Sequence, residues 1–386
     1  MRVLHVGKYY PPYNGGMENF LRDLLKALKG EGISVSALVH HHIPGRRFCR
    51  EADDGVGIAR VPSLGELLYL PVSPAFPLLL RHTIRNFQPD ILHFHFPNPS
   101  ACWSLLIPEA RSIPWMVQWQ SDVVPSTIDR RLQTAYRCYR PLEQAFLKRT
   151  KRVIVASEPY LECSEPLKRW ASKCCVIPLG INPDRLPWPE AHLIKEAEKG
   201  WRPGALRVLA VGRLTYYKGF DVLIRAARQV PNISVQIVGD GALRGMLEKE
   251  IVSGEIQTRV ALRGGLSNRK LQALFATCHL FCLPSVERTE AFGVVLLEAM
   301  RYGKAIVVSD IPGSGAGWVA RKGSCGFLAP PGDADALADI FKHLSSQPAL
   351  RENIEKKGTE SLPHGFHIRS VAREIKTIYA QVIGEL

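Results

Sequence analysis

Short apolar runs alternate with amphipathic stretches along almost the whole chain, and this alternation limits the folds that the chain can adopt. The runs have the length of single strands, and the stretches between them have a helical period. Fully apolar strands separated by helices indicate parallel sheets that are covered on both faces. The predicted strands are residues 3–6, 35–39, 91–96, 115–119 and 153–156 in the first half, and 208–211, 235–238, 280–283 and 305–308 in the second.

The spacing of apolar residues predicts two helices in particular. In residues 17–29, apolar side chains recur every three or four positions and share one helical face. Residues 368–383 show the same spacing. This last segment is therefore expected to be a helix that packs on one of the two halves.

Proline residues and a charged run interrupt the alternation at residues 181–207. Such breakers are typical of a connection between domains, here with a short helix inside it. A new series of strands and helices begins at Val208, and 386 residues are enough for two domains of ordinary size. We therefore expect an α/β protein of two facing, doubly wound Rossmann-like domains, residues 1–180 and 200–365, with a linker at residues 181–199 and a cleft between the domains.

The chain is basic, since 50 Lys and Arg against 36 Asp and Glu give a formal net charge of +14. This excess suits an anionic partner, which could be a nucleic acid, an anionic membrane or a phosphorylated substrate. We expect no nucleic-acid partner, because the sequence has neither a helix-turn-helix nor an aromatic RNA-binding signature. No apolar run reaches 18 uncharged residues and the N-terminus does not resemble a signal peptide, so a cytoplasmic protein is expected.

The cysteine pattern favours free thiols. The nine cysteines are scattered, and none of them forms a C-x-x-C pair. Cys278, His279 and Cys282 could hold a metal ion, but they lie in an apolar run that is typical of a buried strand. Asp333 and Asp335 precede a predicted helix, where acids serve as caps. The sequence therefore predicts no metal site.

Glycines at the ends of predicted strands mark candidate phosphate-binding loops. Gly15 and Gly16 open the first helix, where free N–H groups and a partial positive charge can bind an anion. Gly239 and Gly241 repeat this arrangement after a later strand. Ordinary turns are the alternative at both places.

One loop also carries two cations. Gly212 and Arg213 follow the strand at residues 208–211, and Lys218 comes just before the next helix. The planar fork of an Arg and the point charge of a Lys at the carboxyl end of a strand can clamp a diphosphate. Two solvated surface cations are the alternative.

Two carboxylates, Glu290 and Glu298, flank the start of an apolar helix. Glu290 is expected on the preceding loop, and Glu298 about two helical turns further on. Carboxylates placed in this way can bind hydroxyls at two points of a nucleotide sugar, and the helix start between them can present N–H groups to phosphate. A capping acid and a surface Glu are the alternative.

Taken in this order, the motifs resemble the retaining glycosyltransferases of family 4, which have the GT-B fold. The resemblance covers essentially the whole chain. It rests on Gly15-Gly16, Gly212-Arg213-Leu214, Lys218-Gly219-Phe220-Asp221, and Glu290 and Glu298 with Phe292-Gly293.

The resemblance implies a role for each of these residues. Arg213 and Lys218 would bind the donor diphosphate. Glu290 would contact the donor sugar and Glu298 the ribose. Backbone groups that would help to hold sugar and phosphate belong to Phe292, Gly293 and Val294. The loop of Gly15 and Gly16 would approach the donor from the opposite domain, and a helix at residues 366–386 would cross back to the N-terminal domain.

Motifs in the N-terminal half are similar to those of bacterial members that build polysaccharides. They are Lys8-Tyr9-Tyr10-Pro11-Pro12, residues 93–99 and Ser121-Asp122-Val123-Val124. Many such members transfer mannose from GDP-mannose, so the resemblance implies a nucleotide sugar as donor and a glycan or a polyprenyl-diphosphate-linked acceptor. Acceptor-side candidates are His93, His95, Gln120 and Asp122. These relatives commonly have His where this chain has Gln120, and Gln can hydrogen-bond a hydroxyl but cannot titrate.

Other functions stay open on the sequence alone. They are transfer from another donor such as UDP-glucose or dTDP-rhamnose, epimerisation or hydrolysis of a nucleotide sugar, and a non-catalytic protein that binds sugar or nucleic acid. No cofactor and no metal requirement are expected for transfer. Basic residues at 130–152 and apolar residues at 67–80 indicate peripheral binding to an anionic membrane, with a solvated helix and a core loop as the alternative.

Overall fold

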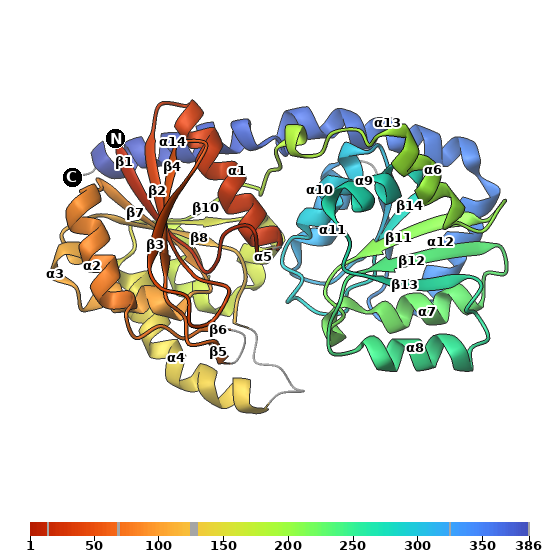
Figure 1. The fold of residues 1–386 in the computed structure, drawn as a ribbon, viewed down its shortest axis with the longest axis horizontal. Coiled ribbons are helices and arrows are strands. Elements are labelled where there is room, and N and C mark those ends of the chain that lie inside the picture. Colours follow the sequence, from red (N-terminus) through yellow and green to blue (C-terminus); the bar gives the residue numbers. More distant parts are fainter. Residues whose placement is uncertain (14, 68–69, 124–129, 324–325, 385–386) are drawn as a thin grey trace. The chain divides into compact units, whose positions relative to one another are not determined.

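The computed structural model describes residues 1–386 apart from positions 14, 68–69, 124–129, 324–325 and 385–386. The chain divides into two compact units, one of Met1–Gly180 with Ile368–Leu386 and the other of Ile181–His367. Each unit is built around its own central sheet, which helices cover (Figure 1). Among the described residues, no helix is both long enough and apolar enough to cross a bilayer.

The first unit contains an eight-stranded sheet in the order β10-β9-β8-β7-β1-β2-β4-β3. Its strands are β1 (Arg2–Val6), β2 (Ser34–His40), β3 (Cys49–Asp53), β4 (Val56–Val61), β7 (Ile91–Phe96), β8 (Trp115–Trp119), β9 (Arg152–Val155) and β10 (Cys174–Val176). All pairs are parallel except β3 with β4. A separate ribbon pairs β5 (Glu66–Leu67) with β6 (Leu70–Pro71). The helices are α1 (Gly16–Gly30), α2 (Phe76–Phe87), α3 (Pro108–Arg111), α4 (Arg130–Arg149), α5 (Glu158–Cys163) and α14 (Ile368–Gly384).

The last helix, α14, packs along α1 in this first unit. Its apolar face is buried, including Ile375 and Tyr379, which have no exposed surface. Arg373 Nε lies 2.9 Å from Glu31 Oε1 at the end of α1. The helical spacing predicted at residues 368–383 thus corresponds to a real amphipathic helix with one buried face.

The second unit contains a fully parallel sheet of six strands in the order β13-β12-β11-β14-β15-β16. The strands are β11 (Leu206–Val211), β12 (Ile233–Val238), β13 (Val260–Gly264), β14 (Leu280–Leu283), β15 (Ala305–Ser309) and β16 (Gly326–Ala329). The helices are α6 (Ala191–Lys199), α7 (Phe220–Arg228), α8 (Arg244–Ser253), α9 (Asn268–Thr277), α10 (Val294–Arg301), α11 (Gly315–Lys322), α12 (Ala334–Ser346) and α13 (Pro348–Gly365).

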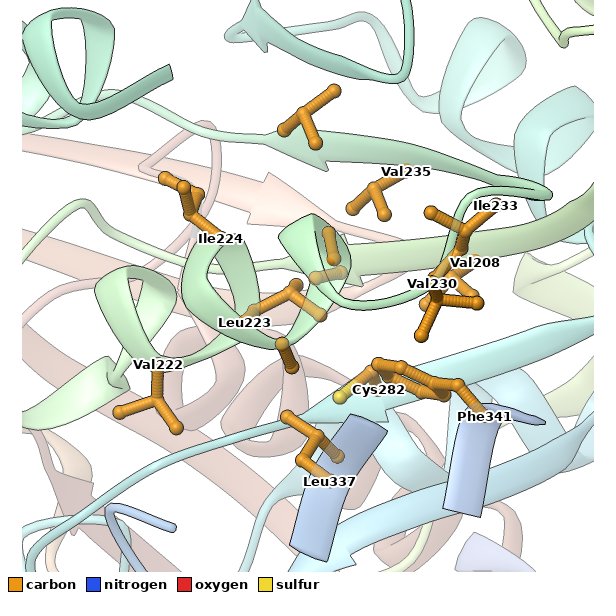
Figure 2. Packing of buried hydrophobic residues seen from close by; sticks show 14 of the residues in the cluster. Val208, Val222, Leu223, Ile224, Val230, Ile233, Val235, Cys282, Leu337 and Phe341 are labelled. Carbon is orange, nitrogen blue, oxygen red and sulfur yellow. The ribbon is translucent and has the colours of Figure 1, made fainter. Parts of the chain in front are cut away.

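Aliphatic side chains from α7 and α12 pack on this sheet. Figure 2 shows Leu223 of α7 and Leu337 of α12 in one cluster with Val208 and Val235 of the strands. Burying a side chain of this size stabilises the fold by about 1.5–3 kcal/mol. Cys282 lies in the same cluster with no exposed surface, which confirms the buried strand predicted there.

Residues 181–199 differ from their prediction as a linker, because they belong to the second unit. Helix α6 packs against α9, and Lys270 Nζ of α9 lies 3.0 Å from Glu196 Oε1 of α6. The apolar face of α6 packs against α9, so this short helix is part of the second unit. The cap predicted at Asp333 is confirmed, since its carboxylate accepts a 2.9 Å hydrogen bond from the Ala336 N–H at the start of α12.

Candidate functional site

The strand order of the second unit reverses between β11 and β14. In an open α/β sheet, the carboxyl ends of the strands at such a switch point are where ligands bind. Gly212, Arg213 and Lys218 follow β11, while Glu290 and Gly293 follow β14. The topology therefore brings together residues that the sequence distributes over more than 80 positions.

Lys218 and Glu290 form a buried ion pair. Lys218 Nζ lies 2.5 Å from Glu290 Oε2, and the same oxygen accepts a 3.0 Å hydrogen bond from Ser285 Oγ. The two charged side chains keep only 12% and 10% of their surface exposed. Burial is the largest single influence and disfavours the Lys218 ammonium, but the charge of Glu290, the interaction with Tyr217 and the hydrogen bond to Glu290 together raise the pKa of Lys218. Lys218 is therefore held in its charged form.

Arg213 adds a second positive charge next to this pair. Its side chain is exposed, and its charge acts on Lys218 in the direction that lowers the Lys218 pKa. The two cations thus repel each other, and Glu290 offsets only one of them. An anion that bridges Arg213 and Lys218 would relieve this repulsion, and a diphosphate has the charge and the acceptor oxygens to do so.

The loop that carries Glu290 leads directly into α10. Gly293 caps this helix in the left-handed region, with φ at +78°, and Val294 is the first helical residue. Phe292 has only 2% of its surface exposed, and its ring lies 6.3 Å from each of the rings of Trp318 and Phe366. Its side chain is therefore part of the core. The first turn of α10 offers a ligand backbone N–H groups that have no partner within the helix.

Gly239 and Gly241, predicted as a donor loop, are needed for packing between neighbouring loops. A Cβ atom at Gly239, whose φ is +141°, would collide with the Gly212 carbonyl oxygen, and one at Gly241 would meet the Leu214 carbonyl. The Leu214 N–H donates a 3.0 Å hydrogen bond to the Asp240 carbonyl. The two glycines thus let this loop support the backbone of the cation-bearing loop.

Glu298 is paired with a residue from the segment that the sequence marked as a linker. Arg185 Nη2 lies 3.3 Å from Glu298 Oε1, and these side chains are 16% and 15% exposed. Gln272 on α9 donates a 3.3 Å hydrogen bond from Nε2 to the Arg185 carbonyl, and this bond holds Arg185 against α9. Arg185 can therefore orient the Glu298 carboxylate.

The first unit has its own switch point between β1 and β7. A small hollow lies there, and its lining comprises Gly7, Lys8, Tyr9, Met17, Glu18, Leu21, His95, Pro97 and Gln120. Gly15 caps α1 with extended backbone angles, and Gly16 is the first residue of the helix. A Cβ atom at Gly15 would meet the carboxylate of Glu18, so a side chain at this position would displace the Glu18 side chain.

The acceptor-side candidates fall into two groups. His95 and Gln120 line the hollow, and Gln120 Nε2 is buried without a hydrogen-bond partner among the described residues. Asp122 instead supports the fold, since its carboxylate accepts hydrogen bonds from Trp119 Nε1 at 2.8 Å and Ser164 Oγ at 2.6 Å. His93 lies on the same face of β7 as His95 but is not part of the hollow lining, and its Nδ1 lies 2.5 Å from Tyr379 Oη of α14.

Three of the residues that organise the site could not be identified from the sequence. Ser285 and Ser314 are single serines in loops: Ser285 binds the Glu290 carboxylate, and Ser314 Oγ donates a 2.5 Å hydrogen bond to the Glu290 carbonyl. Arg185 lies between Pro183 and Pro187, in a segment that the sequence predicts as a linker. None of the three belongs to a motif with a defined spacing.

Comparisons with known proteins agree with this arrangement. The family described as "Glycosyl transferase 4-like domain" matches residues 15–180, and the family described as "Glycosyl transferases group 1" matches residues 194–361. The O-antigen chain mannosyltransferase C of Escherichia coli is 30% identical over 352 residues, which cover 89% of this chain and 88% of that protein.

Two further similarities point in the same direction. The D-rhamnosyltransferase WbpZ of Pseudomonas aeruginosa is 28% identical over 359 residues, covering 92% of this chain and 89% of that protein. The structure of Anabaena HepE in complex with UDP and glucose superimposes with a TM-score of 0.77 at 20% identity, covering 99% of this chain and 100% of that one. At this identity the structural likeness concerns the fold.

Proposed function

Because the chain belongs to the glycosyltransferases of family 4, with the GT-B fold, we propose that it transfers a hexose from a nucleotide sugar to a glycan or lipid-linked acceptor with retention of anomeric configuration. The observation that carries this proposal is the buried pair of Lys218 and Glu290 beside Arg213 at the switch point of the second unit. This group combines charges for a diphosphate with a carboxylate for sugar hydroxyls.

The cations act on the leaving group. As the bond between sugar and diphosphate breaks, negative charge develops on the phosphate oxygens. Lys218 and Arg213 are already in place to stabilise that charge, and so is the N-terminal end of α10. Lys218 gives one of its three hydrogen bonds to Glu290, which leaves donors for phosphate.

The carboxylates hold the sugar parts of the donor. Glu290 has one oxygen fixed by Lys218 and Ser285, and its other oxygen can accept from a hydroxyl of the transferred hexose. Glu298, fixed by Arg185, lies about one turn into α10, and we assign it to the ribose hydroxyls. Arg213 and Lys218 supply the charge that a divalent metal supplies in other transferases, so added Mg²⁺ or Mn²⁺ should leave the rate unchanged.

Mannose from GDP-mannose is the donor that we favour. The name of the Escherichia coli relative supports mannose and an O-antigen-like product. The Pseudomonas aeruginosa relative is named for rhamnose, which keeps that sugar as the second choice. Bacterial surface polysaccharide synthesis is the process that the name of the Escherichia coli relative supports.

An anionic membrane surface is the proposed place of action. Large apolar side chains of the first unit are exposed, including Leu67 at 67%, Leu78 at 72% and Leu106 at 72%. Arg137 and Arg140 are exposed on α4, whereas the side chains of Arg130 and Arg131 lie outside the described residues. Apolar residues combined with cations suit peripheral binding to anionic lipid. Co-sedimentation with anionic vesicles that is insensitive both to salt and to charge reversal at these arginines would refute it.

A donor panel with lipid-linked acceptor extracts tests the function. GDP-mannose, UDP-glucose and dTDP-rhamnose are each incubated with the protein, with and without acceptor, and the anomeric configuration of the product is read by NMR. We expect acceptor-dependent α-mannosyl transfer from GDP-mannose. Donor consumption that needs no acceptor would identify a hydrolase or epimerase, and binding without turnover would identify a sugar-binding protein. An inverted linkage would overturn the retaining mechanism.

A further inference from the structure

Three histidine side chains meet on one face of the first unit's sheet, apart from the residues proposed to bind the donor. His93 and His95 are two positions apart on β7, so their side chains point to the same face. His5 on β1 is the register partner of His93. All three side chains are buried, with exposures of 0%, 0% and 3% for His5, His93 and His95.

The separation of these rings matches that of ligands around one metal ion. In a tetrahedral site, Zn–N bonds of about 2.0–2.1 Å place ligand nitrogens about 3.4 Å apart and imidazole centres about 5 Å apart. The ring centres of His5, His93 and His95 are 4.7, 4.9 and 5.4 Å apart. His5 Nδ1 lies 3.0 Å from His95 Nε2, and one nitrogen of each ring can be chosen so that all three lie within 4.8 Å of one another.

The hydrogen bonds leave nitrogens available for a ligand. His93 Nε2 and His95 Nδ1 are buried without a partner among the described residues, which costs free energy unless something binds them. A ring nitrogen that carries no proton can coordinate a metal ion.

Tyr379 of α14 completes the pattern. His93 Nδ1 lies 2.5 Å from Tyr379 Oη, and His5 Nε2 lies 3.4 Å from the same oxygen. Histidine ligands commonly donate their second ring N–H to such an oxygen, which fixes the ring and the tautomer. Tyr379 thus orients two of the three rings, while His5 Nδ1 lies 3.0 Å from His95 Nε2 and His93 Nε2 stays without a hydrogen-bond partner among the described residues.

We propose that His5, His93 and His95 bind one Zn²⁺ ion, with a water molecule in the fourth position. The ion would join β1 to β7 and, through Tyr379, anchor α14 to the sheet. The hollow that His95 lines gives solvent a route to the site. The role of this ion is structural and separate from the transfer chemistry. The metal site can therefore be tested independently of the proposed function.

Metal titration of the full chain, purified without a polyhistidine tag and stripped with a chelator, tests the proposal. We expect about one equivalent of Zn²⁺ by calorimetry and elemental analysis. Co²⁺ used as a probe should show the visible absorption of a tetrahedral site. His93→Gln and His95→Gln should each lose at least 90% of the bound metal, and Tyr379→Phe should weaken affinity about 10–100-fold.

His82→Gln is the matched control, because His82 is an exposed histidine on α2 and should bind metal as the wild type does. Circular dichroism before titration shows whether each variant is folded. A folded wild-type chain that binds less than about a tenth of an equivalent would overturn the proposal and leave a hydrogen-bonded histidine chain. A folded His93→Gln variant with wild-type affinity would overturn it as well.

Discussion

Lys218 Nζ and Glu290 Oε2 lie 2.5 Å apart, although 72 positions separate the two residues in the sequence. The pair exists because β11 and β14 are neighbours at a reversal of strand order, so the loops that follow them meet. The Val286 N–H also donates a 2.8 Å hydrogen bond to the Tyr217 carbonyl, which joins the same two loops. A buried pair of this kind places a cation and a carboxylate before any substrate arrives.

Arg185→Ala should weaken donor binding without abolishing transfer. The change removes the guanidinium that orients Glu298, so the carboxylate loses its fixed direction toward the ribose. We expect the KM for the nucleotide sugar to rise about 5–20-fold and kcat to change less than about threefold. Steady-state kinetics measure both, and Arg185→Lys should restore part of the loss. A KM that stays at the wild-type value would show that Arg185 has no positioning role.

Gly239→Ala should destabilise the second unit. The new Cβ would collide with the Gly212 carbonyl oxygen, and the backbone at φ +141° is unfavourable for alanine. The free energy of unfolding should fall by roughly 2–4 kcal/mol in urea titration. Gly245→Ala is the control, because this helical glycine has open space around it and should gain about 0.5–1 kcal/mol. Equal unfolding curves for the two variants would contradict the close approach of the loops.

Glu143 on α4 should make stability depend on pH. The residue is 1% exposed, and burial, with a smaller contribution from Asp122, raises the pKa of its carboxyl to about 7 from an ordinary value of 4.5. Between these values the unfolded chain has lost the proton that the folded chain retains, so stability falls as pH rises from about 4.5 to 7 and then levels off. The loss attributable to this group is on the order of 1–3 kcal/mol.

Glu143→Gln removes this titration while keeping the shape of the side chain. The variant and the wild type should be equally stable near pH 4.5, and the variant should be the more stable one above pH 7. Urea titrations at four pH values between 4.5 and 8 provide the comparison. Parallel stability profiles for the two proteins would mean that Glu143 keeps an ordinary pKa in the fold.

The interior strands of both sheets could be predicted from the sequence with the exception of β4, while the edge strands could not. Each predicted strand is present to within two residues, as are the helices predicted at 17–29 and 368–383. The strands that were missed include all four sheet edges, β3, β10, β13 and β16. The predicted interior strands are covered on both faces and therefore read as apolar runs. The edge strand β3 instead carries polar residues, and the edge strands β10 and β16 have only three and four residues.

The site residues also form two groups, those that a sequence motif identifies and those that only the folded structure identifies. Arg213, Lys218 and Glu290 could be found because they stand at fixed distances from glycines at the ends of apolar strands. Arg185 and Ser285 could not, because their contacts depend on how separate loops fold together. Gly239 and Gly241 are visible as glycines in the sequence. Only the structure shows why glycine is needed there, because a Cβ atom at either position would meet the backbone of the neighbouring loop.

The most direct test of the proposed donor site is the nucleotide-sugar kinetics of Lys218→Ala. Removing the ammonium takes away a diphosphate contact and leaves Glu290 buried without its partner, so kcat/KM should fall at least 100-fold with the donor that the panel identifies. Lys249→Ala, at an exposed lysine on α8, should keep the wild-type rate. A folded Lys218→Ala variant with kcat/KM within threefold of the wild type would contradict the assignment of the donor site.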